Sequence, residues 1–162
     1  MRNAARRLPS AEGIGPVTAD RPLGEVLEFL RTLWGLNHAL ESASRRMRVR
    51  FGVTGPERMV VRLAGRYPGI SAGDLARILR VHPSTLTGLL KRLVARGILT
   101  RRADAADSRR ALFALTAKGT SVDVVKKGTV EAVLTAALAE VPAREVRAAA
   151  AVLDQLTRTL EG

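Results

Sequence analysis

The stretch from residue 71 to residue 97 constrains the fold most, because it holds two short apolar stripes at helical spacing around a tight turn. The turn is Val81-His82-Pro83, and Pro83 suits the first position of a helix because it has no N–H to leave unpaired. Gly97 ends the second stripe, as a glycine after a helix commonly does. The stripes consist of Leu75, Ala76, Ile78 and Leu79, and of Leu86, Leu89, Leu90, Leu93 and Val94. Two short helices joined in this way predict a helix-turn-helix.

A β-hairpin is predicted directly after these helices. Residues 98–102 and 112–115 have the pattern of short strands, and the polar segment 103–110 lies between them. The connection is longer than a two-residue turn. A helix-turn-helix followed by a basic hairpin is the pattern of a winged helix-turn-helix.

The flanking segments are predicted to be helical. Apolar spacing indicates a first helix from Leu23 to about Arg50 and a second that begins near Thr54. After the hairpin, Thr116 caps a fifth helix that runs to about Leu138, and Pro142 opens a sixth. Capping boxes are expected at Thr54 with Glu57 and at Ser71 with Asp74. The predicted fold class is therefore mainly α with a small β-hairpin wing.

Charge points to a polyanionic partner. The 162 residues include 27 Lys and Arg against 15 Asp and Glu, a formal net charge of +12. Such a surplus favours nucleic acid or an anionic membrane surface, although a bias of the genome towards arginine codons would also raise it. No apolar run approaches the roughly 20 residues of a membrane span, and no secretory signal is evident, so a cytoplasmic location is expected.

Several chemistries are not expected. The chain has no cysteine, which excludes disulfides, thiolate zinc sites and thiol-based sensing. His38 and His82 are its two histidines and belong to no helix-spaced cluster, so neither a metal nor a cofactor is predicted. The sequence shows no phosphate loop, no catalytic triad and no pair of carboxylates in an apolar setting, so the chain is not expected to be an enzyme.

The second helix of the predicted helix-turn-helix has a polar outer face suited to the major groove. From Ser84 to Arg96 it carries three cations and no acid, whereas a solvated face usually mixes both signs. Small hydroxyls let a helix approach the bases closely, and Lys and Arg favour guanine. The predicted major-groove residues are Ser84, Thr85, Thr87, Gly88, Lys91 and Arg92.

The hairpin is the second predicted DNA contact. An arginine at a hairpin tip can enter a narrow minor groove, and an acid two residues away can orient its guanidinium, as Asp107 could for Arg109. An ordinary surface ion pair would explain the same spacing. The predicted wing residues are Arg101, Arg102, Asp107, Arg109 and Arg110.

Three motifs in register give this chain a resemblance to a known family. Within residues 93–99 (LVARGIL) the recognition helix ends in a basic residue and a glycine, Arg96 and Gly97. The wing then has the form Asp-x-x-Asp-x-Arg at 104–109, and Leu-Thr-x-x-Gly follows at 115–119. This order is similar to that of the MarR (multiple antibiotic resistance regulator) family of winged helix-turn-helix transcription factors. The match extends over roughly Leu23 to Leu160.

The resemblance implies a domain at 21–162, with a DNA-binding lobe at about 54–116 and dimerisation helices at about 23–50 and 117–161. It implies a homodimer on double-stranded DNA, usually a repressor, and a pseudo-palindromic site; long amphipathic helices at both ends of the chain independently favour the dimer. A small, perhaps aromatic, effector would release the DNA. Candidate residues for its pocket are Trp34, His38, Met59 and Arg62, for which a core position or an ion pair is the simpler interpretation.

Residues 1–20 are interpreted as a flexible basic arm, either without a role or in contact with the DNA backbone. Two alternatives to a specific regulator stay open. An architectural DNA-binding protein would show little sequence preference and a steep dependence on salt. A winged-helix protein-interaction module would keep its partners after loss of the wing arginines.

Overall fold

The computed structural model describes residues 23–161, which fall into two units divided between Leu36 and Asn37. Helix α1 (Glu25–Phe51) crosses this division. The predicted arm at residues 1–20 lies outside the described residues. In the first unit, the N-terminal part of α1 leaves large apolar side chains exposed: Val26, Leu27, Phe29, Trp34 and Leu36.

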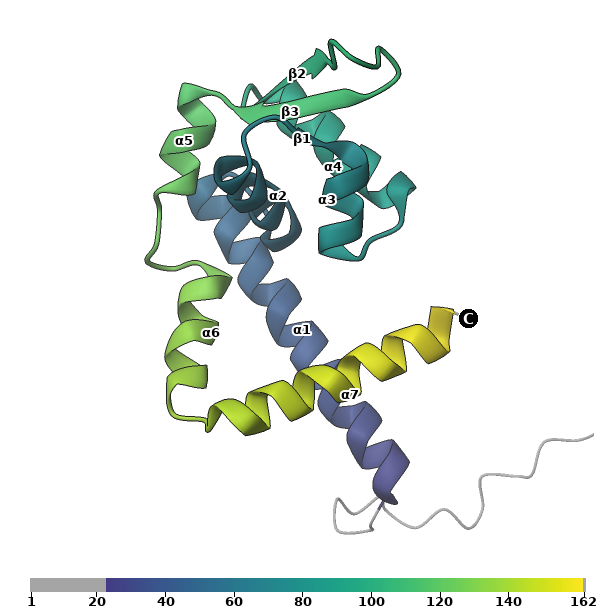
Figure 1. The fold of residues 1–162 in the computed structure, drawn as a ribbon. Coiled ribbons are helices and arrows are strands. Elements are labelled where there is room, and N and C mark those ends of the chain that lie inside the picture. Colours follow the sequence, from purple (N-terminus) through teal and green to yellow (C-terminus); the bar gives the residue numbers. More distant parts are fainter. Residues whose placement is uncertain (1–22, 162) are drawn as a thin grey trace, which may run out of the picture. The chain divides into compact units, whose positions relative to one another are not determined.

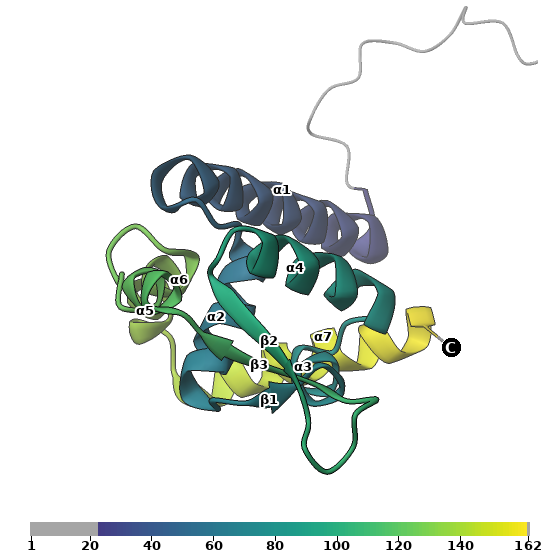
Figure 2. The ribbon, with the colours of Figure 1, turned by 90° about the horizontal axis from the view of Figure 1, so that it is seen from above.

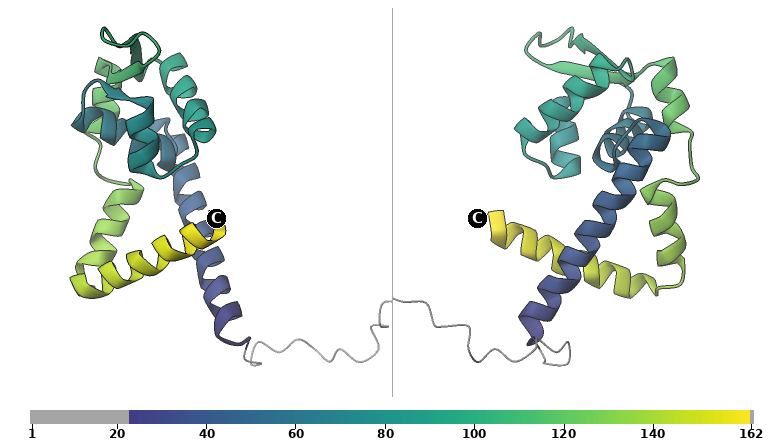
Figure 3. Two further views of the ribbon diagram at one scale, coloured as in Figure 1. Left: turned by 45° about the vertical axis from the view of Figure 1, so that its right-hand side comes forward. Right: turned by 180° about the vertical axis from the view of Figure 1, so that it is seen from behind.

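The second unit contains the rest of the described chain. Its elements are the remainder of α1, α2 (Gly55–Arg66), β1 (Ile70–Ser71), α3 (Ala72–Leu79), α4 (Pro83–Ala95), β2 (Leu99–Ala103), β3 (Ala111–Leu115), α5 (Ala117–Asp123), α6 (Val130–Ala139) and α7 (Ala143–Glu161) (Figure 1). The predicted fold class is confirmed: the described residues are mostly helical, and α3 and α4 form a helix-turn-helix followed by a hairpin. Within this unit the strands lie at one end and α6 and α7 at the other (Figure 3).

The sheet has one strand more than predicted. Its order is β1-β3-β2 and all pairs are antiparallel, with Ile70 opposite Phe113 and Arg101 opposite the same Phe113 on the other side. The added strand β1 is only two residues long and ends directly before α3, so periodicity alone could not distinguish it from a loop. It fixes the hairpin to the base of the helix-turn-helix.

The prediction of a single fifth helix from Thr116 to about Leu138 is wrong. The chain forms α5 and α6 instead, separated by six residues that include Val125, which was assigned to the apolar stripe. Gly128 has a φ of +79°, a left-handed conformation that ends regular helix and suits glycine. The hydroxyl of Thr129 then accepts a hydrogen bond from the N–H of Ala132 at 3.2 Å and caps a new helix.

The hydrophobic core belongs to the lobe around α2, α3, α4 and the sheet. Fully buried side chains from each element meet there: Val60, Val61, Leu75, Leu86, Leu93, Ile98 and Leu99. The capping box of Thr54 and Glu57 is confirmed. The one at Ser71 is confirmed only in half: Ser71 accepts from the N–H of Asp74 at 3.1 Å, but the Asp74 carboxylate accepts from the Ser71 hydroxyl.

Candidate nucleic-acid interface

Helix α4 is amphipathic, and its buried stripe determines which side chains face outwards. Leu86, Leu89, Leu90 and Leu93 are buried in the core. Pro83 occupies the first turn as predicted, and Gly97 follows the helix with a φ of +65°. The hairpin loop projects beyond α4 and the strands (Figure 2).

The N-terminus of α4 is capped by a residue that sequence reasoning missed. The Nδ1 atom of His82 accepts a hydrogen bond from the backbone N–H of Ser84 at 3.3 Å and lies 2.7 Å from its hydroxyl oxygen. The signal for this cap was the position of His82 directly before a proline at the first helical position.

The predicted major-groove residues divide between a face and a flank of α4. Ser84, Thr87, Gly88 and Lys91 follow the helical spacing of three and four residues and therefore share one face. Ser84, Thr87 and Lys91 are exposed, and Gly88 is half-buried. The hydroxyl of Thr87 donates to the carbonyl oxygen of Pro83 at 2.8 Å, which leaves its acceptor lone pairs for other partners.

On the flank of α4, Thr85 is exposed, and Arg92 forms an ion pair with Glu57 of α2. Its Nε lies 3.2 Å from Oε1 of this acid. Arg96 binds the other carboxylate oxygen, also at 3.2 Å. Sequence reasoning assigned Glu57 only a capping role, because contacts between α2 and α4 leave no local pattern.

Glu57 stays ionised although its side chain is only 3% exposed. Burial by itself raises the pKa of this carboxyl, but the hydrogen bond from the Thr54 N–H and the charges of Arg92 and Arg96 bring the pKa below its ordinary value. The result is a fixed anion between α2 and α4.

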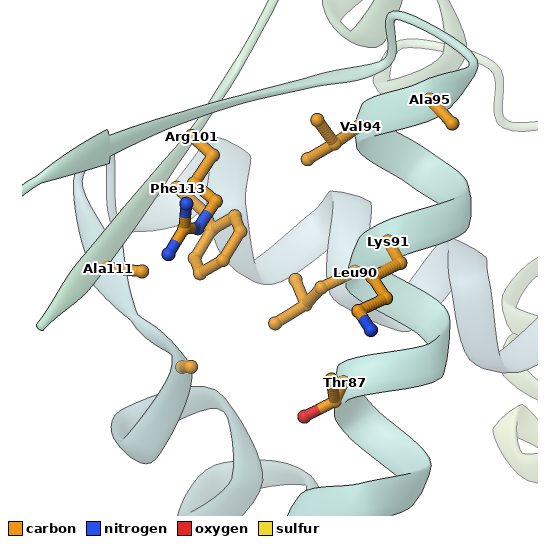
Figure 4. A pocket seen from close by; sticks show the side chains of 9 residues that line it. Thr87, Leu90, Lys91, Val94, Ala95, Arg101, Ala111 and Phe113 are labelled. Atoms are coloured by element: carbon orange, nitrogen blue, oxygen red, sulfur yellow. The ribbon is translucent and has the colours of Figure 1, made fainter.

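A hollow of about 560 Å³ lies between α4 and the hairpin (Figure 4). Its apolar wall includes Leu90 and Phe113, and Figure 4 shows Thr87 and Lys91 on the side of the helix that borders it. Arg101 reaches it from β2. The structure thus brings together side chains that were predicted separately for the helix and for the wing, and the lining residues include two cations and no acid.

The hairpin loop holds the predicted Asp107 and Arg109 together. One Asp107 oxygen accepts from the backbone N–H of Arg109 at 3.0 Å and lies 3.7 Å from its side-chain Nε. Asp104 makes a similar turn with the N–H of Ala106 at 3.0 Å. The Arg109 side chain is 95% exposed, so its guanidinium projects into solvent.

Of the remaining wing residues, Arg101 and Arg102 lie on β2, and Arg110 directly precedes β3. Arg110 forms a long ion pair with Asp74 at 3.8 Å, which connects the wing to α3. Hydrogen bonds from Arg77 and Ser71 and the charge of Arg110 keep the pKa of the Asp74 carboxyl below its ordinary value. Arg102 is exposed on β2.

Of the four predicted effector residues, one lies in the first unit and three lie in the second. Trp34 belongs to the first unit and His38 to the second, and both are exposed on α1. Met59 and Arg62 are three residues apart on α2. The expected ion pair of Arg62 is present, to Asp123 at 2.8 Å. The expectation of a core position is wrong for Met59, which is 46% exposed, and for Trp34, which is 69% exposed.

A second hollow, of about 490 Å³, lies between α2 and α6 and includes Arg62 in its lining. Arg58 also lines it, and the Arg58 side chain is 4% exposed. Arg58 pairs with Glu131 at 2.8 Å and donates to the carbonyl oxygens of Val122, Asp123 and Val125 at the end of α5. Sequence reasoning missed this buried cation, which connects three helices.

Other sites are not evident in the described part of the chain. Residues 23–161 contain no group of three or more His, Cys, Asp or Glu placed to hold a metal ion. None of the helices described there is both long enough and apolar enough to cross a membrane.

A helix-turn-helix with a capped, cationic second helix and a basic hairpin defines this lobe as a winged helix-turn-helix. The MarR family model matches residues 51–110. The transcriptional repressors Rv2887 of Mycobacterium tuberculosis and Mb2911 of Mycobacterium bovis are each 30% identical over 105 residues, 65% of this chain and 76% of theirs. The chain therefore belongs to the MarR family of transcriptional regulators.

Solved structures show the same fold at lower identity. The transcriptional regulator SlyA is 22% identical with a TM-score of 0.67, covering 82% of this chain and 94% of its own. MepR of S. aureus, solved as a DNA complex, is 19% identical with a TM-score of 0.67, covering 85% and 99%. These likenesses extend well beyond the lobe that the family model matches.

Proposed function

We propose that this chain is a repressor that binds a specific DNA operator through α4 and the hairpin. The observation that carries the proposal is the hollow between these elements, where Thr87 and Lys91 of α4 lie opposite Arg101 of β2 with no acid among the lining residues. A hollow that carries two cations and no acid beside an exposed hydroxyl group suits a duplex, because the cations can contact phosphates and the hydroxyl can bond to a base edge.

In this proposal the two elements read different grooves. Ser84, Thr87 and Lys91 occupy the major groove, and Arg109 enters the adjacent minor groove, where the negative potential is concentrated. Asp107 supports this role because its carboxylate lies beside the Arg109 guanidinium without covering it. The relatives named as transcriptional repressors favour repression as the outcome.

The chain is proposed to act as a homodimer. In the second unit, α6 and α7 expose a series of large apolar side chains: Val133, Leu134, Leu138, Val152, Leu153 and Leu160. Exposed apolar surface of this extent marks an interaction site, and α1 carries a comparable series. These helices would form the dimerisation lobe, and about residues 54–116 the DNA-binding lobe. A two-fold dimer would require half-sites about 10 base pairs apart.

Binding of a small-molecule effector is proposed to release the DNA. The hollow between α2 and α6 supports it, because it contains Arg62 beside the buried Arg58. A ligand there would contact both the lobe and α6, and it would release DNA only if it bound one arrangement of these elements more tightly than the other. Trp34, His38 and Met59 do not line this hollow, and their role in effector binding stays a prediction.

The proposal is tested by titrating the purified protein into a duplex selected from genomic DNA and into a random duplex, with molar mass measured by light scattering. We expect twice the 17.4 kDa of the chain and an affinity for the selected duplex about 10³-fold higher than for random DNA or more. Equal affinities with a steep dependence on salt would favour the architectural alternative, which the net charge of +12 also supports.

A further inference from the structure

We infer that Glu57 is a positioning residue that anchors Arg92 as a clamp for a backbone phosphate beside the recognition helix. The inference rests on the proposed function and changes one of its assignments. Arg92 was predicted to read bases together with Ser84, Thr87 and Lys91. Its contacts favour a different role, which carries no sequence information but determines how firmly α4 is held in the groove.

The position of Arg92 on α4 is the first argument. Arg92 follows Lys91 by one residue and therefore lies about 100° around the helix from it. A helix that fills the major groove directs its outer face to the bases and its flanks to the phosphates along the rims. The flank position thus places Arg92 towards the backbone.

The way the guanidinium is bound is the second argument. Its inner nitrogen, Nε, lies 3.2 Å from Oε1 of Glu57. One of its outer nitrogens, Nη1, lies over the half-buried Gly88, 3.5 Å from where a Cβ atom would stand. The side chain is nevertheless 55% exposed. The inner edge is therefore anchored, and the outer edge presents N–H donors in the planar geometry that matches a phosphate.

The anchor itself cannot follow Arg92 into solvent. Glu57 accepts from the N–H of Thr54 at 3.0 Å and from Arg96 at 3.2 Å, and it is almost completely buried. One acid opposes two guanidinium groups, so the cluster keeps a net positive charge. A cation held in place before binding loses less conformational freedom when it contacts DNA than a free side chain does.

The test uses a fluorescent random duplex of about 30 base pairs, titrated with the full chain between about 50 and 200 mM salt. Arg92→Gln should reduce the slope of log affinity against log salt by about 0.9 for each protomer bound. The matched control is Arg144→Gln on α7, where Arg144 pairs with the exposed Glu145 at 3.8 Å. This control removes the same charge far from α4 and should leave the slope unchanged.

Glu57→Gln tests the anchoring. It should weaken binding about three- to tenfold in the presence of Arg92 and have no further effect in the Arg92→Gln protein, because the two residues act as one unit. A merely structural role for Glu57 would weaken binding by the same factor in both backgrounds, and this result would overturn the inference. Glu145→Gln, alone and with Arg144→Gln, is the control cycle.

Arg92→Lys keeps the test valid if Glu57→Gln fails to fold. An ammonium group cannot bind Glu57 and a phosphate through separate edges, so we expect an unchanged slope with an affinity about three- to tenfold lower. A wild-type slope in Arg92→Gln would overturn the inference while leaving the proposed function intact. A wild-type protein that binds no duplex at any salt concentration would overturn both.

Discussion

A Cβ atom on Gly119 would lie 2.2 Å from the carbonyl oxygen of Ile98, closer than two such atoms can approach. The first turn of α5 therefore lies directly against the beginning of the hairpin. Thr116 strengthens the same junction, because its hydroxyl donates to the carbonyl oxygen of Gly97 at 2.7 Å and accepts from the N–H of Gly119 at 3.0 Å. This geometry gives a physical reason for the Leu-Thr-x-x-Gly motif.

Gly119→Ala is expected to lower the free energy of unfolding by about 1–3 kcal/mol, because the backbone of Ile98 must move to admit the methyl group. Urea denaturation followed by circular dichroism measures the change. Gly73→Ala in α3 is the matched control, since the nearest atom to its Cβ would be 3.8 Å away. The control should be neutral or stabilising by up to about 1 kcal/mol. An equal loss in the free energy of unfolding in both variants would contradict the close approach of Gly119 to the Ile98 carbonyl.

Arg58→Met should lower the free energy of unfolding by about 3 kcal/mol. The change removes one partner of a largely buried ion pair and leaves Glu131 and three carbonyl oxygens of the α5 terminus without their donor. Arg62→Met, also on α2, removes an exposed ion pair to Asp123 and should cost about 0–1 kcal/mol. The same urea titration distinguishes the two. Equal losses in the two variants would mean that the buried network of Arg58 stabilises the fold no more than the exposed ion pair of Arg62 does.

Stability should fall as the solution becomes acidic. The charge and hydrogen bonds of Arg58 bring the pKa of Glu131 below its ordinary value of 4.5 despite partial burial, which by itself raises it. A carboxyl with a lowered pKa in the folded state stabilises the protein above its ordinary pKa, and this contribution is lost as the pH falls through the lowered value. Between about pH 6 and pH 3, the free energy of unfolding should therefore fall less with decreasing pH in Glu131→Gln than in the wild type. Identical pH profiles would contradict this role for Glu131.

Arg109→Ala should weaken binding to a selected operator by about 1–3 kcal/mol, since it removes the exposed guanidinium at the wing. The fold should be unaffected because the side chain is 95% exposed. A gel-shift titration measures the affinity, with Arg144→Ala on α7 as the control for loss of charge. If both variants bind the operator like the wild type, the minor-groove role of Arg109 is wrong.

Changes at Thr87 and Lys91 should alter which bases are preferred more than they alter affinity for random DNA, because base contacts determine specificity. Selection of DNA by Thr87→Val or Lys91→Gln, compared with the wild type, checks this expectation. If random and selected duplexes weaken by the same factor, these residues contact the backbone and not the bases.

Local signals predicted much of this fold correctly. A capping box at Thr54, a proline at the first position of α4 and a glycine after it are read within a few residues, and each is present. The Asp107–Arg109 pair was predicted in the same way, because both residues lie within one turn of the chain.

Apart from the local His82 cap, most features that were missed depend on contacts between distant segments. Strand β1 exists only because Ile70 pairs with Phe113, and Glu57 meets Arg92 across thirty-five positions of sequence. The break between α5 and α6 was missed for a different reason. The apolar spacing continues across Gly128, so periodicity outweighed a glycine that the backbone in fact uses in a left-handed conformation.

Selection of genomic DNA fragments by the purified wild-type protein, followed by sequencing, tests the central claim most directly. A dimer that places two α4 helices in successive major grooves should enrich fragments that share a pseudo-palindrome with half-sites about 10 base pairs apart. Recovery of fragments without a shared motif, in proportion to their abundance, would contradict specific recognition by α4 and the wing.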